Sequence, residues 1–247
     1  MKFKNYYFLF IMSSLLCFTA CKKDPVTKPV KFTATKYATV GYDFVGKPNY
    51  LLKDTISADL LSFIRTTLPN QKNLTISHPE LFASTAIADI AITRTSDVYI
   101  TFVAQDGANK NSIAYYTYPT NNPPTTAKDI LLITYVFPSA GHLTPLVAGD
   151  KVKIGKFEAG ISIGFVLMQN AWNNTTQELN NDAVHFCSND ALNPEVDPNL
   201  KKHAVLIKYV PDGKILIGFE DTDRTSSLCD NDFNDVIIYG TVTGSHN

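Results

Sequence analysis

The chain has 247 residues, of which 45% are hydrophobic and 18% are charged, and its formal net charge is −1. This size and composition are typical of one globular domain with a small additional segment. Because the charge is near neutral and no long Lys/Arg cluster occurs, the sequence excludes the basic surface that is typical of nucleic-acid-binding proteins.

Residues 1–20 have the pattern of an export signal peptide. Lysines near the start precede an apolar stretch from Tyr6 to Leu16, which is too short for a membrane span. Small residues then precede Cys21, and this arrangement resembles the lipobox of Bacteroidota lipoproteins, in which the cysteine is acylated. The resemblance implies an outer-membrane lipoprotein that is anchored through Cys21, with its exposure at the cell surface left open. The alternative is an ordinary secretory signal with a chance cysteine.

Residues 21–30 are predicted to form a lipidated tether, because the polar stretch "KKDPVTKPV" with its two prolines favours an extended linker. Within the N-terminal segment 31–87, the sequence predicts one helix in "DTISADLLSFIRTTLP". Thr55 or Ser57 can cap the start of this helix, and Pro69 ends it. One face of the helix is apolar and carries Ile56, Leu60, Leu61, Ile64 and Leu68.

The hydrophobic period changes to two at about residue 88. About ten short β-type runs follow, among them "SDVYITFVA", "ISIGFVLM" and "VIIYGTV", and clusters of Gly, Pro, Asn and Asp separate them. No helical pattern intervenes. The sequence therefore predicts a mainly β protein in which residues 88–243 form an antiparallel, jelly-roll-like β-sandwich behind a short N-terminal helical segment.

Two cysteines lie in this predicted domain. Of the four cysteines, Cys17 belongs to the signal peptide and Cys21 is the anchor, which leaves Cys187 and Cys229. Thiols of exported proteins often form disulfides in their oxidising surroundings. The sequence therefore predicts a Cys187–Cys229 disulfide, with two separate buried thiols as the alternative. A zinc site is disfavoured because the chain has no CxxC motif and no clustered Cys/His spacing.

An acidic loop lies near the C-terminus, in "IGFEDTDRTSSLCDNDFNDVIIYG". The apolar runs on either side are predicted to pair as antiparallel strands, which brings carboxylates at the strand ends to within about 5 Å of one another. Such like charges repel, and the repulsion grows as water is excluded. Arg224 is the only basic residue inside the loop, so a hard divalent cation is the favoured partner. Ca²⁺ fits, since it takes about six to eight oxygen ligands.

The spacing within this loop also favours a cation site. Asp230, Asp232 and Asn234 alternate, so a looped backbone can turn them toward one centre while Phe233 faces the other way and anchors the loop in the core. A further ligand can come from the end of the preceding strand. The loop is not an EF-hand, because its sixth position is not Gly and its twelfth is not Glu. The alternative is a solvated acidic loop with Asx-turns.

The motif "IGFED" followed by "DNDFNDVII" resembles the signature of an uncharacterised domain family of exported bacterial proteins, which includes LruC-type proteins and the C-terminal parts of large calcium-dependent adhesins. Upstream stretches resemble the family too, so the likeness covers about residues 88–243. The turn "QDGAN" departs from the family pattern and makes Asp106 a candidate extra ligand. The resemblance implies a β-rich domain without established enzymatic activity and a structural Ca²⁺ site formed by Glu220, Asp221, Asp230, Asp232, Asn234 and Asp235.

The sequence contains no recognisable catalytic motif, and none of its five histidines has a metal-site or triad spacing. His203 and Trp172 are interpreted as structural residues, although Trp172 could stack on a sugar ring. We expect a non-enzymatic, lipid-anchored, calcium-binding cell-surface module for adhesion or ligand binding, whose ligand is a glycan or a surface protein. The alternatives are an accessory lipoprotein of an envelope assembly and, less favoured, a glycan-active hydrolase with paired carboxylates.

Overall fold

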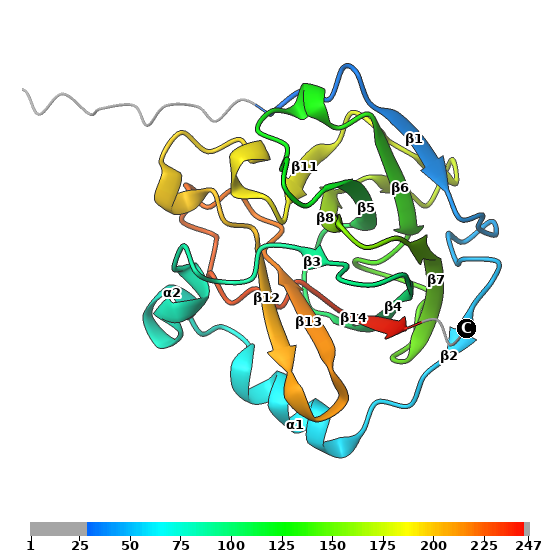
Figure 1. The fold of residues 1–247 in the computed structure, drawn as a ribbon. Coiled ribbons are helices and arrows are strands. Elements are labelled where there is room, and N and C mark those ends of the chain that lie inside the picture. Colours follow the sequence, from blue (N-terminus) through cyan, green and yellow to red (C-terminus); the bar gives the residue numbers. More distant parts are fainter. Residues whose placement is uncertain (1–28, 245–247) are drawn as a thin grey trace, which may run out of the picture.

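The computed structural model describes residues 29–244, so the predicted signal peptide, Cys21 and most of the tether lie outside the described residues. The fold is mainly β, with 38% strand and 14% helix, which confirms the predicted class. Two sheets of six strands each make up most of it, and a two-stranded ribbon adds to them (Figure 1).

The first sheet, called here the β5 sheet, is antiparallel except at one edge. Its first strand pairs in parallel with its neighbour, through Lys36↔Leu132 to Thr39↔Tyr135. The short strand β3 (Ile90–Ala91) pairs with β8 outside the main path. The order along that path is β1 (Lys36–Thr39), β6 (Leu132–Phe137), β5 (Ser112–Pro119), β8 (Ile161–Gln169) and β11 (Val184–Cys187).

The second sheet, called here the β14 sheet, is antiparallel throughout. The ribbon of β9 (Trp172–Asn173) and β10 (Glu178–Leu179) lies outside both sheets. The strand order of the β14 sheet is β12 (Ala204–Tyr209), β13 (Lys214–Phe219), β14 (Val236–Gly244), β4 (Ser96–Gln105), β7 (Asp150–Phe157) and β2 (Leu52–Lys53).

The main hydrophobic core lies between the two sheets. Alternate residues of each strand point to the same face, so every second side chain of the central strands enters this core. The β5 sheet contributes residues such as Ile113, Phe165 and Leu167, and the β14 sheet contributes residues such as Ile100, Ile217 and Ile238. Face-to-face packing of two sheets agrees with the predicted sandwich.

The predicted helix is present as α1 (Ala58–Thr67). Ser57 caps its start, because its side-chain oxygen accepts a hydrogen bond of 3.1 Å from the amide of Leu60. The helix packs on the outer face of the β14 sheet, where Leu60 and Ile64 join a second cluster with Leu216 and Phe233. Figure 1 shows α1 beside the β12–β13 hairpin.

Other helical elements are short and were not predicted. The helix α2 (Leu74–Ser77) begins after Asn73, whose side chain accepts from the amide of Thr75. Single 3-10 turns connect several of the strands. They are η1 (Pro79–Phe82), η2 (Ala127–Asp129), η3 (Asp190–Leu192), η4 (Pro198–Leu200) and η5 (Val210–Asp212).

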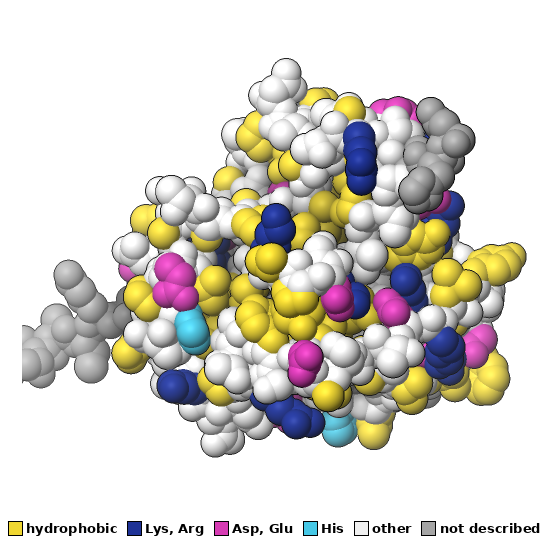
Figure 2. All heavy atoms as spheres, turned by 60° about the horizontal axis from the view of Figure 1, so that its bottom comes forward, with side chains coloured by type: hydrophobic (Ala, Val, Ile, Leu, Met, Phe, Trp, Pro, Cys, Tyr) yellow, Lys and Arg dark blue, Asp and Glu magenta, His cyan; other side chains and the backbone are white. Residues whose placement is uncertain are grey.

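A third apolar cluster covers the outer face of the β5 sheet, where Phe32, Tyr116 and Val166 pack together. Trp172 is 2% exposed, which confirms that it is a packing residue. Figure 2 shows acidic and basic side chains interspersed on one face of the molecule rather than gathered by sign. No helix within residues 29–244 has the length and apolar character needed to cross a membrane.

Candidate metal centre

The acidic loop connects β13 to β14. The two strands pair up to Phe219↔Val236, so the loop leaves the sheet at Glu220 and returns at Asp235. Phe233 is fully buried in the cluster under α1, which confirms its predicted anchoring role. The loop is therefore attached to the core in its middle as well as at its ends.

Three carboxylates of the loop converge. Glu220, Asp230 and Asp232 each offer one oxygen, and these oxygens all lie within 4.8 Å of one another. Glu220 and Asp232 are buried, whereas Asp230 is exposed. The group is thus closed on the protein side and open to solvent at Asp230.

Backbone amides hold Asp232 in place. Its Oδ2 accepts from the amide of Gln71 at 2.7 Å, and its Oδ1 accepts from the amide of Asn234 at 3.1 Å. The amide of Asp232 itself donates to Oδ1 of Asp230 at 3.3 Å. The amide of Leu74, the first residue of α2, also donates to the carbonyl of Asn231 at 2.9 Å, so the loop is joined both to the segment after α1 and to α2.

Two residues of the loop adopt left-handed backbone conformations. Asn231 has φ of 60° and Phe233 has φ of 57°. Asn tolerates this region, but for Phe it costs about 1–2 kcal/mol. These conformations alternate with Asp232 between them, and they place the intervening carboxylate toward Asp230 and Glu220 while Phe233 enters the core.

Burial and mutual repulsion both disfavour the charged forms of these carboxylates. Burial, followed by the charge of Asp230, raises the pKa of the Glu220 carboxyl to about 7. Burial also raises the pKa of Asp232, with a further contribution from the charge of Asp230. Among the described residues, none forms a hydrogen bond with Oε2 of Glu220, although that atom is buried. A buried carboxylate oxygen without a partner is costly.

Asp221 and Asp235, which were predicted as ligands, belong to a different cluster. Oδ1 of Asp221 accepts from the side-chain amide of Asn109 at 3.0 Å, and its Oδ2 accepts from that of Asn111 at 2.5 Å. The amide of Asp221 donates to Oδ2 of Asp235 at 2.7 Å. Burial, followed by the charges of Asp221 and Glu220, raises the pKa of Asp235 to about 9, so the two clusters are electrostatically coupled.

Gly107 makes room for this second cluster. A Cβ at Gly107 would lie 2.7 Å from Oδ2 of Asp221 and 2.9 Å from Oδ1 of Asp235. Asp106, the candidate extra ligand from the same turn, accepts instead from the side chain of Asn70 at 2.5 Å. The remaining predicted ligand, Asn234, lines a cavity beside α1. The structure thus brings carboxylate oxygens of Glu220, Asp230 and Asp232 together and joins Asp221 to Asp235 in a neighbouring cluster. Asn234 lies next to Asp232, to whose Oδ1 its amide donates.

The direct contacts of Arg224 are with an amide side chain, a backbone carbonyl and aromatic rings, although it also interacts through its charge with Glu220. Its Nε donates to Oδ1 of Asn231 at 2.8 Å, and its guanidinium lies over the rings of Phe82 and Phe233 at 5.6 and 5.5 Å from their centroids. One guanidinium nitrogen also donates to the carbonyl of Lys202 at 3.0 Å. Arg224 therefore stabilises the loop backbone and its anchor.

The predicted Cys187–Cys229 disulfide is not present, because both residues are free thiols in the structure. They lie in different surroundings. Cys187 is fully buried at the end of β11, where its amide donates to Oδ1 of Asn193 at 2.6 Å. Cys229 lies in the acidic loop, and its thiol interacts with the carboxylate of Glu220. The alternative of two separate buried thiols describes the structure in part, because Cys187 is buried whereas Cys229 is half-buried.

Comparison with known proteins supports the domain but does not define its activity. Residues 157–243 match the model of a family described as a domain of unknown function, DUF4114. The match includes β13, the acidic loop and β14, and it covers the C-terminal part of the region in which we expected a family likeness. No curated protein and no solved structure matches the chain.

Proposed function

We propose that Glu220, Asp230 and Asp232 bind a structural Ca²⁺ ion. The observation that carries this proposal is the buried Oε2 atom of Glu220, which lacks a hydrogen-bond partner among the described residues and belongs to a group of converging carboxylates. A cation is the partner that satisfies such an oxygen and removes the repulsion at the same time. All three side chains offer oxygen, the ligand atom that Ca²⁺ prefers.

The ion would join parts of the chain that are separate in sequence. Glu220 follows β13, whereas Asp230 and Asp232 lie just before β14, and Asp232 also accepts from the segment after α1. The exposed side of the group, at Asp230, leaves room for water ligands. Binding to the folded state alone stabilises by about 2.7 kcal/mol when free Ca²⁺ is at roughly a hundredfold excess over its Kd.

We further propose that this calcium-stabilised domain is a non-enzymatic, lipid-anchored module of the outer membrane that serves adhesion or ligand binding. The signal pattern and Cys21 support export and anchoring, and the tether would separate the domain from the lipid surface. The mainly β fold and the match to a domain without an assigned activity are compatible with a binding module.

A calcium titration of thermal stability tests the proposal. The full chain is stripped of metal with a chelator, and its melting temperature is followed against Ca²⁺ and against Mg²⁺. We expect a saturable rise with Ca²⁺ and a weaker one with Mg²⁺, since Mg²⁺ demands a stricter octahedral geometry. The variant Asp230→Asn should lose most of the rise.

The matched control is Asp212→Asn. Asp212 is an acid at the turn between β12 and β13, where it pairs with Lys214 and takes no part in the carboxylate group. This variant should keep the full calcium response. If the wild type responds to neither ion, or if both variants respond alike, the calcium site is refuted.

A further inference from the structure

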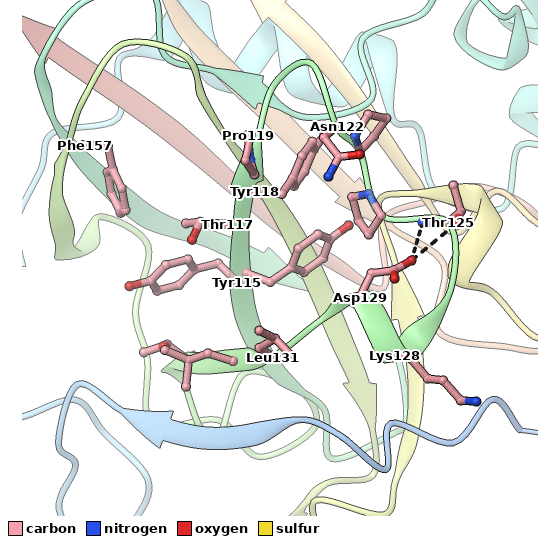
Figure 3. A pocket seen from close by; sticks show the side chains of 15 residues that line it. Tyr115, Thr117, Tyr118, Pro119, Asn122, Thr125, Lys128, Asp129, Leu131 and Phe157 are labelled. Atoms are coloured by element: carbon pink, nitrogen blue, oxygen red, sulfur yellow. Dashed lines mark hydrogen bonds between the residues drawn. The ribbon is translucent and has the colours of Figure 1, made fainter.

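The β5 sheet opens at one end. Strands β5 and β6 pair only as far as Tyr115↔Thr134, whereas β5 continues to pair with β8 through Pro119. From Tyr116 onward, one edge of β5 therefore has no strand partner among the described residues. A cavity of about 700 Å³ occupies this opening, and the connection between β5 and β6 borders it (Figure 3). Its volume lies within the range of ligand pockets.

Fixed aromatic rings line the cavity. Tyr115 donates its hydroxyl to the carbonyl of Ile154 at 3.1 Å, and Tyr118 donates to Oδ2 of Asp89 at 2.5 Å. The ring of Phe157 meets that of Tyr115 edge to face, with centroids 6.3 Å apart. Protein groups hold both hydroxyls, and the ring of Tyr118 also stacks on that of Tyr116 with centroids 6.0 Å apart, so these rings are held in place where they border the cavity (Figure 3).

The loop that borders the cavity is also preorganised. The carboxylate of Asp129 accepts from the amides of Thr125 at 3.0 Å and Thr126 at 2.8 Å, and a capping box closes the turn. The carboxylate of Asp129 is thus occupied by hydrogen bonds within its own loop. A pocket with a fixed border loses little conformational entropy when a ligand binds.

The polar groups of the cavity are mostly neutral. Thr117 is exposed in the middle of the opening, and Asn122 and Thr134 add an amide and a second hydroxyl (Figure 3). The charged side chains in the lining, Lys128 and Asp129, are exposed and belong to the border loop. Flat apolar rings beside neutral hydrogen-bonding groups are complementary to a sugar, which has C–H faces and a rim of hydroxyls.

An extended peptide fits this opening less well, although an unpaired strand edge can accept one. Pro119 ends the free edge of β5 and has no amide hydrogen to donate. Pro123 and Pro124 border the cavity beyond it. Prolines at a sheet edge protect it from strand addition.

We propose that the cavity between β5 and β6 is the ligand site of the protein and that it binds a neutral oligosaccharide. This inference rests on the ligand-binding role proposed above and assigns it a place and a chemical class. It does not rest on the calcium site, whose residues lie in the β13–β14 loop and outside the cavity lining.

Binding of a panel of neutral soluble oligosaccharides to the full chain tests this proposal, with calorimetry as the readout. In the variant Thr117→Trp, a large side chain fills the opening from an exposed strand position, so the fold is retained. We expect at least one oligosaccharide to bind, with an affinity that Thr117→Trp lowers by about tenfold or more. The control Thr39→Trp, at an exposed strand position outside the cavity lining, should change the affinity by less than about twofold.

The calcium titration is repeated on the same proteins. A normal calcium response without oligosaccharide binding would overturn the cavity proposal and leave the metal site intact. Oligosaccharide binding that both tryptophan variants weaken equally would also overturn it, as would a panel of extended peptides that binds at the cavity in place of sugars. Oligosaccharide binding without any calcium response would support the cavity and refute the metal site alone.

Discussion

His203 and Glu195 form a fully buried pair beneath the acidic loop, with Nε2 of His203 at 2.7 Å from Oε1 of Glu195. The other ring nitrogen, Nδ1, lies 2.9 Å from the carbonyl oxygen of Glu220. A carbonyl only accepts, so Nδ1 carries a proton, and one further proton is shared between Nε2 and the carboxylate. The pair thus fixes the backbone that presents Glu220 to the candidate metal centre.

We predict that replacing either His203 or Glu195 by itself strongly lowers the free energy of unfolding. In His203→Leu the carboxylate of Glu195 stays buried without its partner, and removal of one partner of a buried pair costs about 3–5 kcal/mol. The double variant His203→Leu/Glu195→Leu should lose much less than the sum of the two single variants. Urea unfolding of all four proteins at one calcium concentration measures this coupling, and additive losses would contradict it.

Asp89 predicts a specific dependence of stability on pH. Burial raises the pKa of its carboxyl from 3.8 to about 6, although Ser188 and Tyr118 donate hydrogen bonds to it. The pKa of Asp89 is higher in the folded state than in the unfolded state. The contribution of its protonated carboxyl to the free energy of unfolding is therefore complete below the unfolded-state pKa, and it is lost as the pH rises through about 6. The full effect is about 3 kcal/mol.

The variant Asp89→Asn cannot titrate and serves as the reference. We expect the stability of the wild type relative to this variant to decrease as the pH is raised from about 4 to about 7. Chemical unfolding at several pH values with saturating Ca²⁺ measures the difference. A difference that stays constant across this range, or increases with pH, would contradict the raised pKa.

The cap of α1 is testable with a matched pair of serines. Ser57 accepts from the amide of Leu60, so Ser57→Ala should destabilise the protein by about 1 kcal/mol. Ser62 lies exposed inside the same helix, where Ala has the higher helix propensity, and Ser62→Ala should be neutral or slightly stabilising. Equal effects of the two substitutions in thermal unfolding would argue against the cap.

The fold class was predicted from the period with which hydrophobic residues recur along the sequence. The elements that were not predicted are those whose structure depends on pairing with segments that are distant in sequence. The strand β4 and the helix α1 have long, regular patterns and were predicted from them. The two-residue strand β2 is defined by its pairing with β7, and β1 by its parallel pairing with β6. Such short segments carry no periodic signal of their own, so the sequence could not indicate them.

The candidate site was predicted as one centre from the spacing of the loop residues and from the family resemblance. Glu220 and Asp221 are consecutive in the sequence, but their carboxylates have different partners. Glu220 joins Asp230 and Asp232, whereas Asp221 meets Asn109 and Asn111 from the connection between β4 and β5. The unusual turn "QDGAN" was the available signal for this second cluster, but its position beside Asp221 requires the three-dimensional fold.

The structural role of His203 was predicted, but its partner Glu195 was not. The two residues are separated by the short turn η4, and the intervening sequence has no regular period. Both side chains are buried, and the ring of His203 stacks on that of Phe186 with centroids 3.9 Å apart. A fully buried pair of polar side chains such as this one cannot be predicted from the local pattern of hydrophobic and polar residues in the sequence.

Equilibrium dialysis against Ca²⁺ tests the central claim most directly, with the full chain, Glu220→Gln and Asp221→Asn compared after circular dichroism has verified their folding. We predict one saturable Ca²⁺ per chain, an affinity that falls by about tenfold or more in Glu220→Gln, and a distinctly smaller fall in Asp221→Asn, whose side chain lies in the other cluster. Absence of saturable binding, or equal losses in the two variants, would contradict a calcium centre formed by Glu220, Asp230 and Asp232.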